Sequence, residues 1–266
     1  MMIKGIVAVD LDGTLLDVAG QYSTATRDYL RKLTSAGYAV VLASGRPYRS
    51  MKAIYEDIGS TAPLICYNGA LSFDPKDPSF PTLSKTFPKE SIQTIFEKTR
   101  HYVHSFMAES LTYVYANQVD QRLNRYFPYA GMGLALGPLS ESLRENVYTC
   151  LFNCPVELHG QLKEDCESVP GISWRSWSNS VYSELFIPSA DKGDALAYIM
   201  EHLNVKKEDV YAFGDAENDI TMLSKAGHPF AMKNNRVPEL LSRFPQTENP
   251  VEEDGVIVEL QKWIRL

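Results

Sequence analysis

The chain has 266 residues, of which 44% are hydrophobic and 22% charged, and it carries a formal net charge of −7. A chain of this length can bury a full core without metals or disulfides, and this composition is typical of globular proteins, not of disordered or fibrous ones. The acidic balance and the lack of a Lys/Arg run argue against a nucleic-acid surface, because phosphate backbones require clustered basic side chains.

The N-terminal sequence MMIKGIVAVDLDG contains an apolar stretch of only a few residues, which acids interrupt at once. This pattern is typical of a strand and not of a signal peptide, and no apolar run approaches the length of a membrane span. We therefore expect a cytoplasmic protein. Its four cysteines, Cys66, Cys150, Cys154 and Cys166, are expected to stay free thiols.

The first third of the chain alternates apolar strands with helical patterns. The run from Ile6 to Val9 is continuously apolar, as in a strand buried on both faces of a parallel sheet. A helix is predicted from an N-cap at Ser23 to a stop at Gly37. Further buried strands are predicted at 38–44 and 64–68, so the segment reads as consecutive βαβ units.

The pattern changes after this segment. Three prolines within 74–81 oppose regular structure and predict a turn. Helices then mix with alternating strands, for example over 105–116, before a helix at 191–203 and a buried strand at 210–214 restore the α/β rhythm.

We therefore expect an α/β fold with a Rossmann-like, doubly wound parallel sheet as its core. Residues 1–82 and 186–266 are predicted to form this core, which is discontinuous in sequence. Residues 83–185 are predicted to form an inserted α+β cap domain of ordinary domain size.

Two acids follow the first predicted strand. Asp10 and Asp12 lie two residues apart in DLDGTLLD, so continued extended geometry would point both carboxylates the same way. Such a pair repels itself unless a cation lies beside it, which indicates a metal site. A strand followed by an Asp-Gly turn, which Gly13 permits, is the alternative explanation.

Two further motifs suggest anion binding. Ser44, in SGRP, follows the second buried strand, where a hydroxyl and exposed backbone N–H groups can hold phosphate oxygens, although a simple turn would look the same. Lys192, in ADKGDAL, stands at a predicted helix start, where the helix dipole disfavours a cation. It either serves an anion or is a solvated surface lysine.

The fourth motif, GDAENDI, places Asp215 at the end of a strand, with Asn218 and Asp219 opening the next helix. Hard oxygen ligands of this kind suit Mg²⁺, although helix capping would also select Asp and Asn here. All four motifs fall at the carboxyl ends of predicted strands or at the following helix starts. Open α/β sheets bind their ligands there.

Together, DLDGTLL, SGRP, the lysine of DKG and GDAEND resemble the four motifs of the haloacid dehalogenase (HAD)-like hydrolase superfamily. Within it, the chain looks like the Cof-type phosphatases, which carry a large α+β cap of type IIB. The stretches YNGA (67–70), AMKNN (231–235) and TENPVEEDGV (247–256) extend the resemblance over nearly the whole chain. Ser44 stands where many members have threonine, and Lys233 where relatives often have glycine.

The resemblance implies a Mg²⁺-dependent phosphatase that hydrolyses small phosphate monoesters, such as sugar phosphates, through an aspartyl-phosphate. Asp10 would be the nucleophile and Asp12 the general acid and later base. The implied catalytic residues are Asp10, Asp12 and Lys192; the phosphate-binding residues are Leu11, Ser44, Gly45, Lys192 and Asn218; the metal-binding residues are Asp10, Asp12, Asp215 and Asp219; and the supporting residues are Thr14, Arg46, Asn68 and Gly69.

Other functions stay open at this point. A phosphomutase or phosphotransferase would pass the phosphoryl group to a hydroxyl, and a sensor would bind a phosphorylated ligand without turnover. A dehalogenase is disfavoured, because attack on carbon needs neither Mg²⁺ nor Asp12. The expected partner is a small phosphorylated metabolite, with no nucleic acid and no membrane, and the chain is expected to be a monomer or a weak homo-oligomer.

Overall fold

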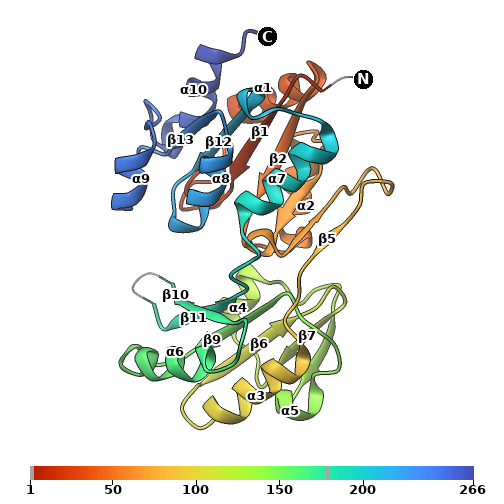
Figure 1. Ribbon diagram of the computed structural model, residues 1–266, viewed down its shortest axis with the longest axis vertical. Coiled ribbons are helices and arrows are strands. Elements are labelled where there is room, and N and C mark those ends of the chain that lie inside the picture. The colour runs from red at the N-terminus through yellow and green to blue at the C-terminus, as the bar shows by residue number, and fades with distance from the viewer. Residues whose placement is uncertain (1–2, 178–179) are drawn as a thin grey trace. The chain divides into compact units, whose positions relative to one another are not determined.

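The computed structural model describes residues 3–177 and 180–266. By its internal contacts the chain divides into two compact units (Figure 1). The first, here called the core unit, consists of Met1–Ser84 and Asp191–Leu266, and the second, the inserted unit, consists of Lys85–Ala190. Two distant stretches of sequence therefore build one unit.

A seven-stranded sheet in the order β13-β12-β1-β2-β3-β4-β5 organises the core unit. Its strands are β1 (Gly5–Asp10), β2 (Tyr38–Ala43), β3 (Leu64–Cys66), β4 (Leu71–Phe73), β5 (Leu83–Ser84), β12 (Val210–Gly214) and β13 (His228–Ala231). The neighbours from β13 to β3 pair in parallel, and β4 and β5 add an antiparallel edge. The predicted α/β class with a parallel sheet is confirmed.

In the part of the chain that the structure describes, six α-helices accompany this sheet: α1 (Thr24–Ser35), α2 (Tyr48–Asp57), α7 (Lys192–Leu203), α8 (Ile220–Lys225), α9 (Pro238–Arg243) and α10 (Gly255–Trp263). Every residue of β1 is buried, as expected for a strand covered on both faces. Ile6 and Ala8 belong to a core cluster that includes Leu196 of α7 and Met222 of α8.

Local signals fix the ends of several elements. The Ser23 side chain accepts a hydrogen bond of 3.0 Å from the N–H of Thr26, and Gly37 has a φ of +94°, so both predicted limits of the first helix are confirmed. The predicted strand at 64–68 is shorter than expected. It ends at Cys66, because the next two residues adopt left-handed backbone conformations.

A six-stranded sheet in the order β10-β11-β9-β6-β7-β8 organises the inserted unit. Its strands are β6 (Ser105–Glu109), β7 (Tyr113–Ala116), β8 (Gly133–Leu136), β9 (Thr149–Asn153), β10 (Ser173–Ser176) and β11 (Tyr182–Phe186). Its helices are α3 (Lys89–Thr99), α4 (Gln121–Tyr126), α5 (Leu139–Ser142) and α6 (His159–Glu167). A separate hydrophobic cluster, including Phe96, Phe106, Phe152 and Leu162, gives this unit its own core.

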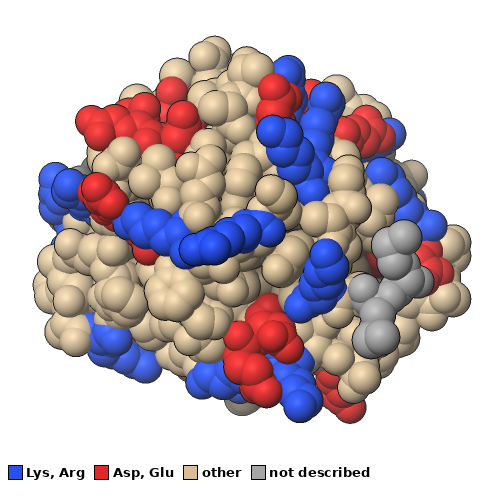
Figure 2. All heavy atoms as spheres, turned by 90° about the horizontal axis from the view of Figure 1, so that it is seen from above, with Lys and Arg blue, Asp and Glu red and all other residues tan. Residues whose placement is uncertain are grey.

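The surface and the thiols agree with the composition. Figure 2 shows lysine and arginine side chains interspersed with acidic and uncharged ones on the face drawn. All four cysteines are buried free thiols. Within residues 3–177 and 180–266, no helix combines the length and the apolar character that crossing a bilayer requires.

Candidate active site

Three adjacent parallel strands bring the sequence motifs to one edge of the core sheet. Strand β1 ends at Asp10, β2 ends one residue before Ser44, and β12 ends one residue before Asp215. The strands are neighbours in the order β12-β1-β2 and run in the same direction (Figure 1). Their carboxyl ends therefore meet, as predicted for a ligand site of an open α/β sheet.

Lys192, the first residue of α7, is fully buried at this edge. Its Nζ donates hydrogen bonds of 2.6 Å to Oδ1 of Asp10 and 2.7 Å to Oδ1 of Asp219. Burial opposes the charge on the amine, but the two carboxylates outweigh it and raise the pKa of Lys192. The alternative of a solvated surface lysine is therefore excluded, and the site contains a fixed positive charge.

Three carboxylates gather around this lysine. Asp10, Asp215 and Asp219 each offer one oxygen, and these oxygens all lie within 4.8 Å of one another. Burial, followed by repulsion from the neighbouring acids, raises the pKa of Asp10 well above its ordinary value and that of Asp215 to about 6. A buried group of hard oxygen donors that repel one another fits a divalent cation such as Mg²⁺.

The loop after β1 supports the Asp215 carboxylate. The Thr14 hydroxyl donates a hydrogen bond of 3.2 Å to Oδ1 of Asp215. Gly13 has a φ of +85° and lies so close to the same carboxylate that a Cβ atom would overlap it. Gly13 therefore does more than permit a turn, which was the only role that its sequence context suggested.

Asp219 is held by three donors. Its Oδ2 accepts the backbone N–H groups of Asp215 at 3.0 Å and Ala216 at 3.1 Å, while its Oδ1 accepts Lys192. Asp219 is also fully buried. This carboxylate therefore fixes both the loop that carries Asp215 and the position of the Lys192 ammonium.

The Asp12 side chain does not pair with Asp10, contrary to the expectation from their spacing. Strand β1 ends at Asp10, so the extended geometry behind that expectation does not continue to Asp12. The Asp12 carboxylate is 54% exposed and binds Arg46, whose Nε lies 2.9 Å from Oδ2 and whose terminal nitrogen contacts Oδ1. The carboxylates that do join Asp10, those of Asp215 and Asp219, come from the segment that follows β12.

The remaining expected residues line the same loops. Leu11 is fully buried in the turn after β1, and its carbonyl accepts the N–H of Thr14 at 3.2 Å. The Ser44 hydroxyl is nearly buried and accepts the N–H of Arg46 at 3.2 Å. The Asn218 side-chain amide donates a hydrogen bond of 2.8 Å to Oδ1 of the Asn68 side chain.

Asn234 is a site residue that the motifs did not single out. Its side-chain N–H donates a hydrogen bond of 2.8 Å to the Gly13 carbonyl, and its oxygen accepts the N–H of Val251 at 3.1 Å. It lies in AMKNN, a stretch identified by resemblance without a role. Asn234 ties the loop after β1 to the C-terminal segment.

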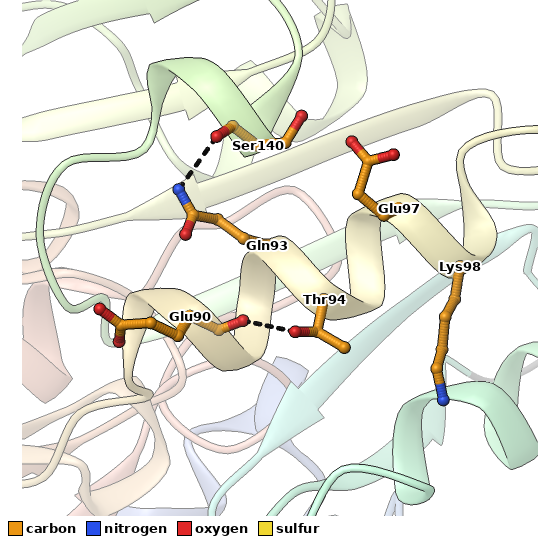
Figure 3. Close-up of a pocket in the computed structure, with 6 residues that line it drawn as sticks. All are labelled: Glu90, Gln93, Thr94, Glu97, Lys98 and Ser140. Carbon is orange, nitrogen blue, oxygen red and sulfur yellow. Dashed lines mark hydrogen bonds between the residues drawn. The ribbon is translucent and has the colours of Figure 1, made fainter.

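An exposed cavity of about 660 Å³ lies elsewhere, on α3 and α5 of the inserted unit (Figure 3). The residues that line it are Glu90, Gln93, Thr94, Glu97, Lys98 and Ser140. Its hydrogen bonds are local, such as that from Thr94 to the Glu90 carbonyl. None of the four motifs contributes to it, so it is not the candidate site.

Comparison with known proteins places the chain among phosphatases. A model of the haloacid dehalogenase-like hydrolase family matches residues 7–260. The chain is 30% identical to the 5-amino-6-(5-phospho-D-ribitylamino)uracil phosphatase YitU of Bacillus subtilis, over 98% of both proteins. It is 28% identical to the HMP-PP phosphatase of Yersinia pseudotuberculosis, over 97% of this chain and 95% of that protein.

A solved structure supports the fold over the whole length. The sugar phosphatase BT4131, described as a member of HAD subclass IIB, superposes with a TM-score of 0.78, covering 97% of this chain and 98% of that one. The two sequences are 18% identical. This likeness concerns the fold, with both the sheet-based core and the inserted segment included.

Proposed function

Because the chain belongs to the haloacid dehalogenase-like hydrolase family and is a phosphoric monoester hydrolase, we propose that it hydrolyses small phosphate monoesters through an aspartyl-phosphate on Asp10. The main support for this proposal is the buried Lys192, whose ammonium group donates hydrogen bonds to Asp10 and Asp219, with the Asp215 carboxylate nearby. A buried cation next to a carboxylate suits the transfer of a dianionic phosphoryl group to that carboxylate.

The proposed reaction has two steps. In the first, an Asp10 oxygen bonds to phosphorus while the bond to the leaving oxygen breaks, and Asp12 donates a proton to that oxygen. In the second, Asp12 takes a proton from water, whose oxygen bonds to phosphorus as the bond to Asp10 breaks. The exposed position of Asp12, outside the buried carboxylate group, suits a residue that exchanges protons with substrate and water.

The other site residues bind and orient the phosphoryl group. We propose that the phosphoryl oxygens accept hydrogen bonds from Lys192, the Ser44 hydroxyl, the Asn218 amide and the backbone N–H groups of Leu11 and Gly45. We assign Mg²⁺ to Asp10, the Asp12 carbonyl and Asp215, with Asp219 completing the acidic group. When bound, this cation supplies positive charge that neutralises the phosphate and the gathered carboxylates.

We propose a small phosphorylated metabolite as the substrate. The relatives named above act on a phosphoribityl compound and on HMP-PP, and BT4131 is named as a sugar phosphatase. We assign residues 83–185 as an α+β cap of the C2B type, which selects the substrate. The location in the cytoplasm and the monomeric or weakly oligomeric state remain predictions.

The test is phosphate release from a panel of sugar, ribityl and pyrimidine phosphate esters, with and without Mg²⁺. Wild type should release phosphate only with Mg²⁺, and Asp10→Asn should reduce release by at least about a thousandfold, because the nucleophile is lost. Asp17→Asn, a change in an exposed loop near the site in sequence, is the control. Undiminished release by Asp10→Asn would refute the proposal, and a new ester detected by phosphorus NMR would indicate a phosphotransferase.

A further inference from the structure

The segment Tyr67–Gly69, which follows β3, has an unusual backbone. Its three residues have positive φ values of 49°, 55° and 104°. Among the described residues, only two other non-glycine positions, Asn204 and Asp254, share this property, and neither has a similar neighbour. Left-handed conformations cost free energy for any residue other than glycine, so the surroundings must hold this segment in place.

The backbone of this segment supports the loop that contains Ser44. The N–H of Asn68 donates a hydrogen bond of 3.0 Å to the Ser44 carbonyl, and the N–H of Tyr67 donates one of 3.3 Å to the Arg46 carbonyl. Gly45, between these two acceptors, lies against the Asn68 amide, because a Cβ there would approach its nitrogen to 3.0 Å. The two loops are therefore in close contact.

The same segment reaches the other two motifs. Gly69 lies against the carbonyl of Asp191, the residue before Lys192, and a Cβ atom would overlap that carbonyl. The side-chain Oδ1 of Asn68 accepts the 2.8 Å hydrogen bond from the Asn218 side-chain amide. One short turn thus contacts the loop after β2, the start of α7 and the loop after β12.

We propose that Asn68 is a positioning residue for phosphoryl transfer and acts through Asn218. The amide of Asn218 has two N–H groups. Asn68 binds one of them, which fixes the plane of the amide and leaves the second N–H as an oriented donor for a phosphate oxygen. The left-handed backbone is what brings the Asn68 side chain to Asn218 while its N–H holds Ser44. This inference rests on the proposed function.

Two substitutions distinguish the contribution of the Asn68 side-chain amide from that of its left-handed backbone. Asn68→Gly keeps access to the left-handed conformation but removes the amide. We expect a folded protein, a drop of roughly tenfold in kcat/KM for p-nitrophenyl phosphate and a similar rise in the inhibition constant of inorganic phosphate, as for one lost hydrogen bond to a charged group. Asn68→Ala should lower kcat/KM by the same factor as Asn68→Gly. It should also lower the melting temperature, since alanine disfavours the left-handed conformation.

Asn204→Gly is the matched control, because Asn204 is left-handed (φ 52°) but caps the far end of α7. It should keep wild-type kinetics. In an Asn218→Ala background, Asn68→Gly should have little further effect, because the positioned amide is already absent. Fully additive losses, or wild-type kinetics for Asn68→Gly, would refute the inference. A wild type without phosphatase activity would instead refute the proposed function.

Discussion

Arg46 binds the proposed general acid through both carboxylate oxygens of Asp12. A carboxylate in this contact is oriented by a planar guanidinium, which lysine cannot reproduce. We expect Arg46→Ala to slow the hydrolysis of esters with poor leaving groups more than the hydrolysis of p-nitrophenyl phosphate. Only poor leaving groups depend strongly on proton donation. The ratio of the two kcat/KM values should change by about tenfold.

Arg31→Ala is the control for this prediction, since Arg31 also pairs with an aspartate, Asp57, but lies outside the site. It should leave both rates and their ratio unchanged. Equal losses on the two esters in Arg46→Ala would mean that Arg46 binds substrate and does not orient Asp12.

Asp215 should make the stability of the metal-free protein depend on pH. Burial and the neighbouring acids raise its pKa from 3.8 to about 6, so the folded state binds more protons than the unfolded state between these values. The stability of the metal-free protein should therefore fall as pH rises from about 4 to about 7, by on the order of 3 kcal/mol from this group. Thermal melting of wild type and Asp215→Asn, both in EDTA, measures the difference.

The sign follows from linkage, since ionisation of Asp215 is less favourable in the fold than in the unfolded chain. Mg²⁺ should stabilise wild type more at neutral than at acidic pH, because protons and the cation compete for the same carboxylates. Parallel pH profiles for wild type and Asp215→Asn would contradict this account.

The sequence predicted which side chains come together better than it predicted their hydrogen-bond partners. Asp10, Lys192 and Asp219 were all expected in one site, and the structure brings them together although 182 positions separate Asp10 from Lys192. Parallel strand order explains that success. The partner of Asp12 could not be predicted, because it depends on where β1 ends and not on residue spacing.

At the scale of elements, Asp120 organises the start of α4. Its carboxylate accepts the N–H groups of Arg122 and Leu123 at 3.0 and 3.1 Å. It also accepts hydrogen bonds from Ser105 at 2.8 Å and Tyr182 at 3.1 Å. Partial burial opposes its ionisation, but these donors prevail and lower the pKa of Asp120.

Asp120→Ala should destabilise the protein by about 1–3 kcal/mol in urea unfolding at neutral pH, because it removes a helix cap and leaves buried donors unpaired. Since the folded pKa is lowered, this loss should be present above the unfolded pKa and shrink as pH falls through the folded value. Asp77→Ala is the control, because the Asp77 carboxylate also accepts hydrogen bonds, from Ser79, but in an exposed turn that caps no helix. It should destabilise the protein less than Asp120→Ala. A destabilisation that does not vary with pH would argue against the ionised cap.

Helix limits were accessible to sequence reasoning where a cap residue marks them, as Ser23 and Gly37 do. The end of β3 was not. Tyr67 leaves the strand in a left-handed conformation, which tyrosine rarely adopts, and the cause is tertiary: hydrogen bonds to a loop about twenty residues earlier. No local pattern in YNGA encodes that partner.

At the scale of the whole molecule, the inserted unit has its own hydrophobic core, which includes Phe87, Phe106, Leu139 and Leu185. A fragment comprising residues 85–190 should therefore fold by itself and unfold cooperatively, as monitored by circular dichroism in urea. As a control, Phe106→Ala within the fragment should lower its stability by about 3–5 kcal/mol or prevent folding. A fragment without a cooperative transition would show that this core is insufficient.

The fold class could be predicted because continuous apolar strands alternating with helices specify a parallel sheet. The order of the six strands in the inserted unit could not be predicted. In this sheet β8 pairs in parallel with β7, whereas all the other neighbouring strands pair antiparallel. Pairings of this kind join strands that are distant in sequence and leave no periodic signature in it.

The covalent intermediate on Asp10 is tested most directly by mass spectrometry of the Asp12→Asn variant after reaction with p-nitrophenyl phosphate and Mg²⁺. This good leaving group needs little proton donation, so the first step should proceed, while the second lacks its base. The account predicts an increase by the mass of one phosphoryl group, located on the peptide that contains Asp10 and absent in Asp10→Asn. An unmodified Asp12→Asn protein that still releases p-nitrophenol in repeated turnovers would contradict the account.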